Sequence, residues 1–402
     1  MKSDLLKDLL EENDNKIIYL IMDGLGGLPR EPLGLTELET ARTPNLDALA
    51  REGICGLLDP VSPGITPGSG PGHLALFGYD PQEFIIGRGV LSALGIGFQL
   101  TEKDVAARLN FCTIDENGLV VDRRAGRIST ELNQKLVEKI RSHVQLPKKV
   151  EFFLETVSEH RAVLILRGEG LGGHINDTDP QETGKAPLEP RGSDPASQKT
   201  AEIVKIFLNQ VKEILKDEHP ANFVLARGFA KYVPLPTMKQ RYGLKAFAIA
   251  QYPMYRGLAR LVGMTVPEKP ANYQAMWQQL QDNYSQYDFF FIHFKKTDSS
   301  GEDGDFDRKV KIIEEIDEWV GQLKTLNPAV IVVTGDHSTP SVLKSHSWHP
   351  VPALLWSPYA RPDSVTQFGE RYCANGYMGR MATKHLIILA LANALRLKKF
   401  GA

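Results

Sequence analysis

The sequence predicts an α/β protein, built on a mostly parallel sheet with helices on both faces and carrying an inserted α+β domain. Uncharged apolar runs alternate with amphipathic segments near both ends of the chain, a pattern typical of a parallel sheet covered by helices. Between about 88 and 242 the pattern changes to paired short runs and two longer helical segments. We therefore expect a discontinuous core of 1–87 and 243–402 and an inserted domain of 88–242.

The first part of the core is expected to run helix, strand, helix. Apolar residues recur at helical spacing in 4–12, and 17–22 is an apolar run without charge, as in a buried strand. The pair Thr43-Pro44 begins the next helix because proline suits a first turn, and Gly53 ends it.

A loop rich in glycine and proline follows, Thr66-Pro67-Gly68-Ser69-Gly70-Pro71-Gly72-His73. Its prolines remove backbone donors and its glycines allow conformations that other residues resist, so no regular helix or strand is expected within it. A short helix is expected from Gly72 to Gly78, and its first N–H groups would favour an anion beside Ser69. Taken alone, Ser69 fits a surface turn better than a nucleophile.

The insertion is expected to combine a hairpin, two helices and a long loop. The runs 151–157 and 162–166 predict the hairpin, and 129–144 and 195–216 predict the helices. The stretch 168–195 holds few large apolar residues and is expected to be a loop. After 242 the alternation resumes, with strands expected at 247–249, 289–294 and 330–333 and helices at 273–280, 306–323 and 383–397.

Composition limits the kinds of partner. The chain has 47 Lys and Arg against 49 Asp and Glu in 402 residues, so its charge gives no reason to expect nucleic acid or an anionic membrane surface. Three cysteines without metal-ligand spacing fit buried free thiols in a reducing compartment. No secretory signal and no apolar run of about 18 residues is found, which favours a soluble cytoplasmic protein. A homo-oligomer remains open.

Carboxylates follow three of the expected strands. Asp23 comes directly after 17–22, Asp298 follows 289–294, and Asp336 follows 330–333. Because the carboxyl ends of parallel strands meet at one edge of a sheet, these side chains should converge. Further ligands stand beside them: Glu302, Asp303, His337, His346 and His349.

Such a cluster needs protons or cations, and the mixture of Asp and His suits Mn²⁺, Zn²⁺ or Mg²⁺, so we infer two divalent ions. A single Asp after a strand more often caps a turn or helix, and it is the recurrence that favours a metal site. The isolated histidines are interpreted as surface or core residues, namely His143, His160, His219 and His385.

Five stretches carry a resemblance to a known family: Asp23-Gly24-Leu25-Gly26, the 66–73 loop, Lys295-Lys296-Thr297-Asp298, Thr334-Gly335-Asp336-His337-Ser338-Thr339-Pro340, and His346 through Pro350-Val351-Pro352. On these stretches the chain resembles the archaeal-type 2,3-bisphosphoglycerate-independent phosphoglycerate mutases of the alkaline phosphatase superfamily. The resemblance implies an alkaline-phosphatase-like core, an inserted domain that closes over the substrate, and two divalent metal ions. Manganese is the expected metal, with Mg²⁺, Zn²⁺ or Co²⁺ as alternatives, and no 2,3-bisphosphoglycerate is required.

The resemblance also implies roles for individual residues. By position, the ligands of one metal would be Asp23, Ser69, Asp336 and His337, and those of the other Asp298, Glu302 and His346. Ser69 would be the nucleophile, with Lys295 as a second catalytic residue. Ser69 would take the phosphoryl group from 3-phosphoglycerate, hold it while glycerate reorients, and return it to give 2-phosphoglycerate. Metal coordination would lower the pKa of the serine hydroxyl, which is a poor nucleophile by itself.

One position departs from the family pattern, which generally has a histidine where this chain has Glu302. A carboxylate still binds Mn²⁺ or Mg²⁺ but adds negative charge, so the metal preference or the rate can differ, down to loss of the mutase activity.

A substrate with a phosphate and a carboxylate calls for guanidinium groups. The candidate substrate-binding residues are Arg88, Arg108, Asn110, Arg123, Arg124, Arg227, Arg256, Asp177 and Asp179, with Lys295 beside the metal cluster. The closest alternative function is a metal-dependent phosphatase or phosphotransferase acting on another small phosphorylated metabolite. A non-catalytic binding protein is disfavoured because the serine and nearly all of the ligands are present.

Overall fold

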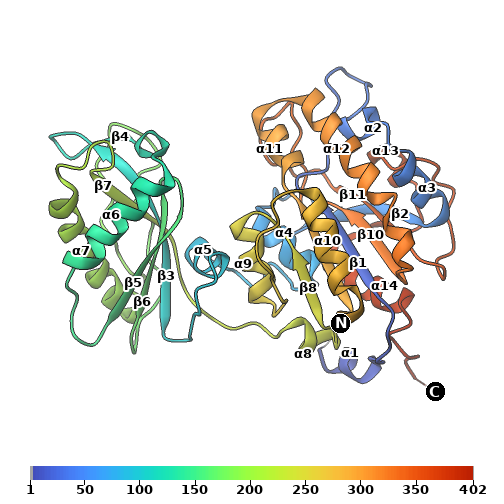
Figure 1. The fold of residues 1–402 in the computed structure, drawn as a ribbon, viewed down its shortest axis with the longest axis horizontal. Coiled ribbons are helices and arrows are strands. Elements are labelled where there is room, and N and C mark those ends of the chain that lie inside the picture. Colours follow the sequence, from blue (N-terminus) through green and yellow to red (C-terminus); the bar gives the residue numbers. More distant parts are fainter. Residues whose placement is uncertain (1–2, 402) are drawn as a thin grey trace. The chain divides into compact units, whose positions relative to one another are not determined.

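A computed structural model describes residues 3–401, which form two compact units (Figure 1). The first unit runs up to Ile85 and resumes at Pro236, and the second unit is Ile86–Leu235. Within the described range no helix is both long and apolar enough to cross a bilayer. The three cysteines are buried free thiols, as predicted.

The first unit contains a seven-stranded sheet in the order β12-β2-β11-β10-β1-β9-β8. Only β11 runs antiparallel to its neighbours β10 and β2, and the other adjacent pairs are parallel. The predicted mostly parallel sheet is therefore confirmed. Its strands are β1 (Ile17–Met22), β2 (Ile54–Asp59), β8 (Ala246–Ile249), β9 (Phe289–Phe294), β10 (Val330–Thr334), β11 (Val351–Trp356) and β12 (Gly379–Ala382).

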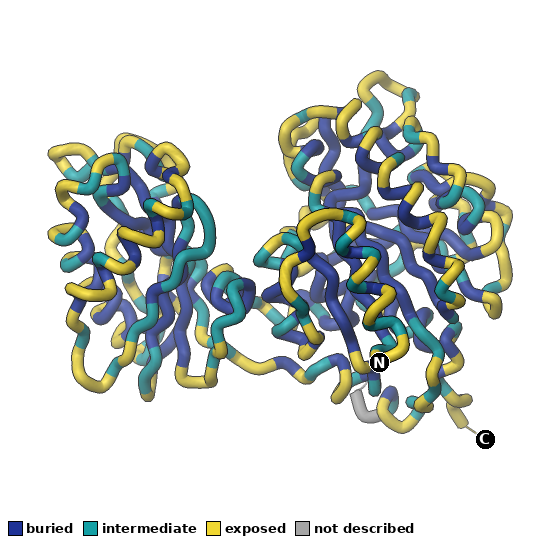
Figure 2. Tube along the Cα trace, in the orientation of Figure 1, coloured by how far each residue is buried: buried dark blue, intermediate teal, exposed yellow. Residues whose placement is uncertain are grey.

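Helices cover both faces of this sheet (Figure 1). Alternate residues of the central strands, such as Leu20 and Phe290, pack in one cluster with residues of α3 (Pro44–Glu52), α10 (Tyr273–Asn283) and α12 (Phe306–Val320). On the opposite face α4 (Ser69–Leu76) and α9 (Pro253–Leu261) bring His73 and Tyr255 against β9. Figure 2 shows the central strands buried along their length.

Shorter elements complete the first unit. They are α1 (Ser3–Leu9), α2 (Glu37–Thr40), α8 (Met238–Tyr242), α11 (Lys296–Asp303), α13 (Glu370–Cys373), α14 (Leu386–Asn393) and the 3₁₀ turns η2 (Tyr284–Gln286), η3 (Leu323–Leu326) and η4 (Thr383–His385).

The second unit is an α+β structure with an antiparallel sheet. Strands β5, β6, β3 and β7 lie side by side, and β4 pairs with the end of β3. Helices α6 and α7 pack on one face against β3, while α5 lies against β3 and β7. The elements are α5 (Arg88–Gly95), β3 (Asp104–Ile114), β4 (Val120–Asp122), η1 (Ala125–Arg127), α6 (Thr130–His143), β5 (Glu151–Ser158), β6 (Arg161–Arg167), α7 (Pro195–Leu215) and β7 (Phe223–Lys231).

The predicted hairpin corresponds to β5 and β6, and both predicted helices are present as α6 and α7. The stretch 168–194 contains one isolated bridge, between Ile175 and Gly192, and is otherwise the loop that was expected.

The expected start of the helix beside the serine is wrong. Helix α4 begins at Ser69 itself, with Gly68 as its N-cap, and Gly72 N–H donates to the Gly68 carbonyl. Pro71 lies in the first turn, where a backbone N–H has no intrahelical partner, so proline does not oppose the helix there. The part of the glycine-proline run from Ser69 onward is thus the first turn of a helix.

Two further expectations differ at boundaries. Helix α8, placed in the insertion by the sequence, belongs to the first unit, where the Tyr242 hydroxyl donates to the Gly78 carbonyl at 3.0 Å. The C-terminal helix ends at Asn393, short of the expected 397, and Asn13 donates its amide to the carbonyls of Ala394 and Leu395 beyond that end.

Phe291 offers a test of the buried face of β9. It is fully buried, and its ring contacts that of Phe77 edge-on at 5.0 Å. Phe291→Ala should lower the free energy of unfolding by about 3–5 kcal/mol because a large cavity remains. All four tryptophans lie in the first unit, so urea denaturation followed by tryptophan fluorescence reports on it. Leu35→Ala, at an exposed position of the first unit, is the control, and an equally small effect of both changes would contradict the prediction.

Candidate active site

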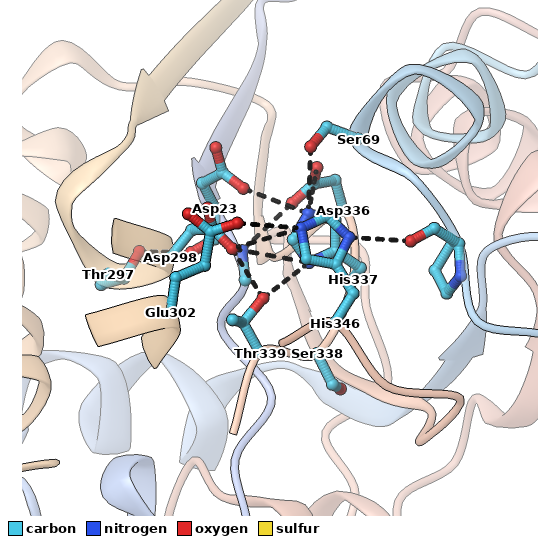
Figure 3. Close-up of polar contacts among 12 residues, drawn as sticks. Asp23, Ser69, Thr297, Asp298, Glu302, Asp336, His337, Ser338, Thr339 and His346 are labelled. Carbon is cyan, nitrogen blue, oxygen red and sulfur yellow. Dashed lines mark hydrogen bonds and ion pairs between the residues drawn. The ribbon is translucent and has the colours of Figure 1, made fainter. Parts of the chain in front are cut away.

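Three aspartates meet at the carboxyl edge of the central strands (Figure 3). Strands β10, β1 and β9 are parallel neighbours. Asp23 directly follows β1, Asp336 lies two residues after β10, and Asp298 stands in α11 just after β9. All three carboxylates are fully buried. Three carboxyl groups are thus buried close to one another.

Gly24 makes this approach sterically feasible. Its φ is +63°, and a Cβ there would lie 2.8 Å from Asp298 Oδ1 and 2.5 Å from Thr339 Oγ1. A larger residue after Asp23 would therefore push the ligand side chains apart.

The side chains form two sets of potential ligand atoms that lie within 4.8 Å of one another. One set is Asp23, Asp336 and His337, and the other is Asp298, His337 and His346. Both oxygens of Asp23 and Oδ2 of Asp336 are buried and accept no hydrogen bond within residues 3–401. A buried carboxylate oxygen without a hydrogen-bond donor is costly unless a cation lies beside it. Carboxylate oxygens and imidazole nitrogens are the ligand atoms of Mn²⁺, Zn²⁺ and Mg²⁺ sites, so these residues fit divalent ions.

Hydrogen bonds orient both imidazoles. The Thr339 hydroxyl donates to Asp298 Oδ1 at 2.6 Å, so its oxygen accepts from His337 Nδ1 at 2.9 Å. His346 Nδ1 donates to the Pro67 carbonyl at 2.9 Å. In both rings the proton is therefore assigned to Nδ1, and Nε2 presents its lone pair, as in histidines that bind metals.

Ser69 opens α4 beside these groups. Its Oγ lies 3.2 Å from His337 Nε2. A Cβ on Gly72, one turn further along, would lie 2.3 Å from the Asp336 carbonyl, so the glycine lets α4 approach the ligand loop closely. The residues of this first turn place the hydroxyl at the cluster of candidate metal ligands.

Lys295 supplies a positive charge among the carboxylates. Its ammonium donates to Asp298 Oδ2 and lies 3.1 Å from Asp23 Oδ2. Burial lowers the pKa of this lysine, but the opposing effect of Asp23 and Asp298 is larger, so the net pKa is above its ordinary range. For Asp23, burial raises the pKa. The positive charge of Lys295 and contacts with nearby histidines outweigh this effect, so the pKa of Asp23 is well below its ordinary value. Both groups are charged.

Glu302 borders the second set without belonging to it. Its Oε1 lies 3.9 Å from His346 Nε2, and 53% of its side chain is exposed. Burial and Asp298 raise the pKa of this carboxyl. Two other sequence candidates lie outside the sets, since Asp303 faces Arg308 and His349 contacts Ser347.

A layer of buried polar residues that the sequence did not single out stands behind the aspartates. His73 Nδ1 lies 2.8 Å from the Ser69 carbonyl and 3.1 Å from Asp336 Oδ2, while His293 Nε2 lies 3.3 Å from Asp23 Oδ2. Tyr255 stacks on His293 at 3.8 Å. A histidine in an otherwise apolar strand was a usable signal for His293. The position of His73 beside Ser69 depends on both residues lying in one helix, one turn apart, which the sequence pattern does not predict.

Comparison with known proteins relates this site to a family. Residues 50–222 match the family model described as 2,3-bisphosphoglycerate-independent phosphoglycerate mutase. A Thermus thermophilus protein named "Probable 2,3-bisphosphoglycerate-independent phosphoglycerate mutase" is 50% identical over 400 residues, 99% of this chain and 98% of that protein. The chain belongs to this phosphoglycerate mutase family. An Aquifex aeolicus protein of the same name is 48% identical over 407 residues, covering 99% of this chain and all of that one.

Solved structures agree with this membership of the phosphoglycerate mutase family. A Pyrococcus horikoshii protein has a TM-score of 0.82 and 32% identity, with 97% of this chain and 100% of that chain covered. The cofactor-independent phosphoglycerate mutase of Thermoplasma acidophilum has a TM-score of 0.73 and 31% identity, with 94% and 100% covered.

In this member of the mutase family, the second unit carries an arginine-rich sheet face. Arg108 of β3 pairs with Arg227 of β7, and Asn110 pairs with Arg161 of β6. Cross-strand partners point to the same side, here the side away from the core that β3 shares with α6 and α7. The sequence named three of these four residues but not Arg161, because register depends on strand pairing.

His160 lies among these arginines. It is buried, its Nδ1 has no hydrogen-bond partner in the described chain, and its pKa is lowered to about 4 by burial and by Arg161, Arg108, Arg124 and Arg127. This histidine, interpreted from the sequence as an ordinary surface or core residue, thus marks where four guanidinium groups gather.

Other arginines expected at the substrate have partners or lie elsewhere. Arg123 donates twice to the buried Asp179, at 2.9 and 2.8 Å, and Arg227 lies 3.3 Å from the same carboxylate. Asp177 accepts from Gly228 N–H at 2.7 Å. Arg88 is exposed at the start of α5.

Arg256 departs from the expected substrate-binding role. It is buried in the first unit, and its guanidinium donates to the carbonyls of Ala250 and Pro267 at 3.2 and 2.6 Å. Because these donors are used by backbone acceptors, the placement favours a structural role.

Buried acids fix the chain that follows Asp23. Glu370 accepts from Gly27 N–H at 2.9 Å and from the Thr36 hydroxyl at 2.6 Å, and Glu37 accepts from Leu28 N–H at 3.1 Å. Burial raises the pKa of Glu370 to about 7, so it takes up a proton far more readily than an exposed glutamate.

Glu370 should make stability depend on pH. Between its ordinary carboxyl range and about pH 7 the folded chain binds this proton and the unfolded chain does not, so the contribution of Glu370 to stability falls as pH rises. Glu370→Gln lacks this titration. The native protein should therefore lose melting temperature relative to the variant between about pH 5 and about pH 8. A difference that stays constant across this range would show that Glu370 titrates normally.

Proposed function

We propose that this chain is a metal-dependent mutase that interconverts 3-phosphoglycerate and 2-phosphoglycerate without 2,3-bisphosphoglycerate, through a phosphoserine at Ser69. The observation that carries the proposal is the position of Ser69 Oγ, 3.2 Å from Nε2 of a histidine that belongs to both sets of metal-ligand atoms. The names of the relatives support this reaction.

Asp23, Asp336 and His337 with Ser69 would hold one divalent ion, and Asp298 and His346, with Glu302 beside them, the other. Manganese fits this mixture of oxygen and nitrogen donors, as do Mg²⁺, Zn²⁺ and Co²⁺. When bound, the ions would lower the pKa of the serine hydroxyl and offset negative charge on the transferring phosphoryl group.

Ser69 would act twice in the cycle. The Ser69 oxygen loses its proton and forms a bond to phosphorus as the bond from phosphorus to the 3-oxygen of the substrate breaks. The 3-oxygen takes up one proton, so the number of protons is unchanged. In the return step the 2-hydroxyl loses a proton and attacks phosphoserine, and Ser69 Oγ recovers its proton. His337, fixed by Thr339, orients the hydroxyl, and the Lys295 ammonium adds positive charge at the carboxylates.

The arginine face of the second unit would bind the acidic groups of the substrate. A phosphate and a carboxylate both suit the planar guanidinium fork. The gathering of Arg108, Arg124, Arg127 and Arg161 around a histidine that stays neutral at physiological pH supports an anion site there.

Ser69→Ala tests the nucleophile. With Mn²⁺ and without 2,3-bisphosphoglycerate, formation of 2-phosphoglycerate should fall by at least about 1,000-fold, because the phosphoryl acceptor is removed. Ser338→Ala is the matched control, since that hydroxyl donates to the His349 carbonyl and Ser338 belongs to neither set of ligand atoms. The product should be followed by coupled assay, and the fold by circular dichroism.

Two outcomes would redirect the proposal. Equal mutase rates in the native chain and Ser69→Ala would exclude the phosphoserine route. Release of inorganic phosphate by the native chain without 2-phosphoglycerate would favour the phosphatase alternative.

Arg124→Met tests the anion site. Arg124 is exposed, and removal of its charge should lower kcat/KM for 3-phosphoglycerate by about 10-fold or more, the loss expected for one hydrogen bond to a charged group. Arg141→Met, on α6 of the same unit, removes an equal charge that faces Glu138 and Glu155 and should leave kcat/KM within about twofold. Equal effects of the two changes would contradict a specific site.

A further inference from the structure

Lys309 is a fully buried lysine on α12 whose ammonium is completely used by backbone oxygens. Its Nζ donates to the carbonyls of Gly24 at 2.9 Å, Gly26 at 3.1 Å and Thr339 at 2.9 Å. An ammonium has three protons, so every one of them has an acceptor.

These carbonyls belong to the two loops that carry metal-ligand candidates. Gly24 directly follows Asp23, and Thr339 comes two residues after His337. The Thr339 hydroxyl in turn hydrogen-bonds to both His337 and Asp298. The backbone N–H of Thr339 donates to the Gly26 carbonyl at 3.0 Å. The 23–27 loop and the 336–341 loop are therefore joined at the ammonium, next to ligands of both sets.

A buried carboxylate completes this arrangement. Glu37 Oε1 lies 4.0 Å from Lys309 Nζ, and both side chains are fully buried. The same carboxylate accepts from Leu28 N–H at 3.1 Å, directly after the first loop, and from Ser341 N–H at 2.8 Å, at the end of the second. A buried charge costs several kcal/mol unless it is paired and hydrogen-bonded. Here the carbonyls and Glu37 reduce that cost, although burial still lowers the pKa of Lys309 below its ordinary value.

We propose that Lys309 is a positioning residue for the metal ligands. Its ammonium holds the two loops in the arrangement in which Asp23, His337 and Asp298 converge, so that the ligands are ordered by folding and little ordering is left for ion binding. The ammonium donates to backbone carbonyls, so in this proposal Lys309 acts on the ligands through the backbone. This inference rests on the metal site of the proposed function.

Lys309→Met tests the inference, because methionine keeps the length of the side chain and removes the donors. The Kd for Mn²⁺, measured by titration calorimetry, should rise by about 10–100-fold, as for other residues that orient metal ligands. The rise in melting temperature on addition of Mn²⁺ should shrink in parallel.

Arg396→Met is the matched control. Arg396 is 2% exposed, and it too donates to backbone carbonyls, those of Asn13 and Asn15, with Asp288 as its acidic partner. None of these residues belongs to a ligand loop. The change should lower the melting temperature and leave the Kd for Mn²⁺ unaltered.

The outcomes separate the two proposals. If the native chain binds no Mn²⁺, the metal site fails and the role of Lys309 fails with it. If native and Lys309→Met chains bind Mn²⁺ equally, the function stands and the positioning role is overturned.

A measurement on the native chain covers the case in which Lys309→Met does not fold. The Thr339 amide should be protected from hydrogen exchange after metal removal by a chelator, because its acceptors are held by Lys309. Rapid exchange that becomes slow only on addition of Mn²⁺ would overturn the inference.

Discussion

Mutual repulsion among three buried carboxylates is the constraint on which this site depends. Asp23, Asp298 and Asp336 are fully buried at the ends of neighbouring parallel strands, where water cannot screen them. Nitrogen-bearing side chains surround these carboxylates. Lys295 contacts both Asp23 and Asp298. His73 lies beside Asp336, and His293 lies beside Asp23. Such an arrangement is suited to cations and would be a liability in a site without them.

The division of the chain follows from the same constraint. The insertion enters between α4 and β8, so the strands that carry the aspartates stay together in one sheet. The arginines that the proposed function assigns to an acidic substrate lie in the inserted unit, on a face of its own sheet. Negative and positive groups are thereby built into separate cores that can each fold around apolar residues.

Those parts of the site that follow from local pattern could be predicted from the sequence. Asp23, Asp298 and Asp336 were recognisable because apolar strands end at them and parallel strand ends share an edge. Lys309 was not, because a lysine on an amphipathic helix usually faces water, and only packing against both loops reveals its acceptors. The helical start at Ser69 does not follow from the local pattern, because glycine and proline oppose a helix in its interior but not in its first turn.

The hydrogen bond from His337 to Thr339 has a consequence for stoichiometry. A neutral imidazole whose Nδ1–H donates a hydrogen bond to a hydroxyl has a single lone pair for a metal ion, on Nε2. His337 can then bind one ion and not two, although it stands in both sets of ligand atoms. An ion held by Asp298 and His346, as proposed, would then have no ligand atom from His337, and the half-exposed Glu302, whose Oε1 lies 3.9 Å from His346 Nε2, is the carboxylate that would join them.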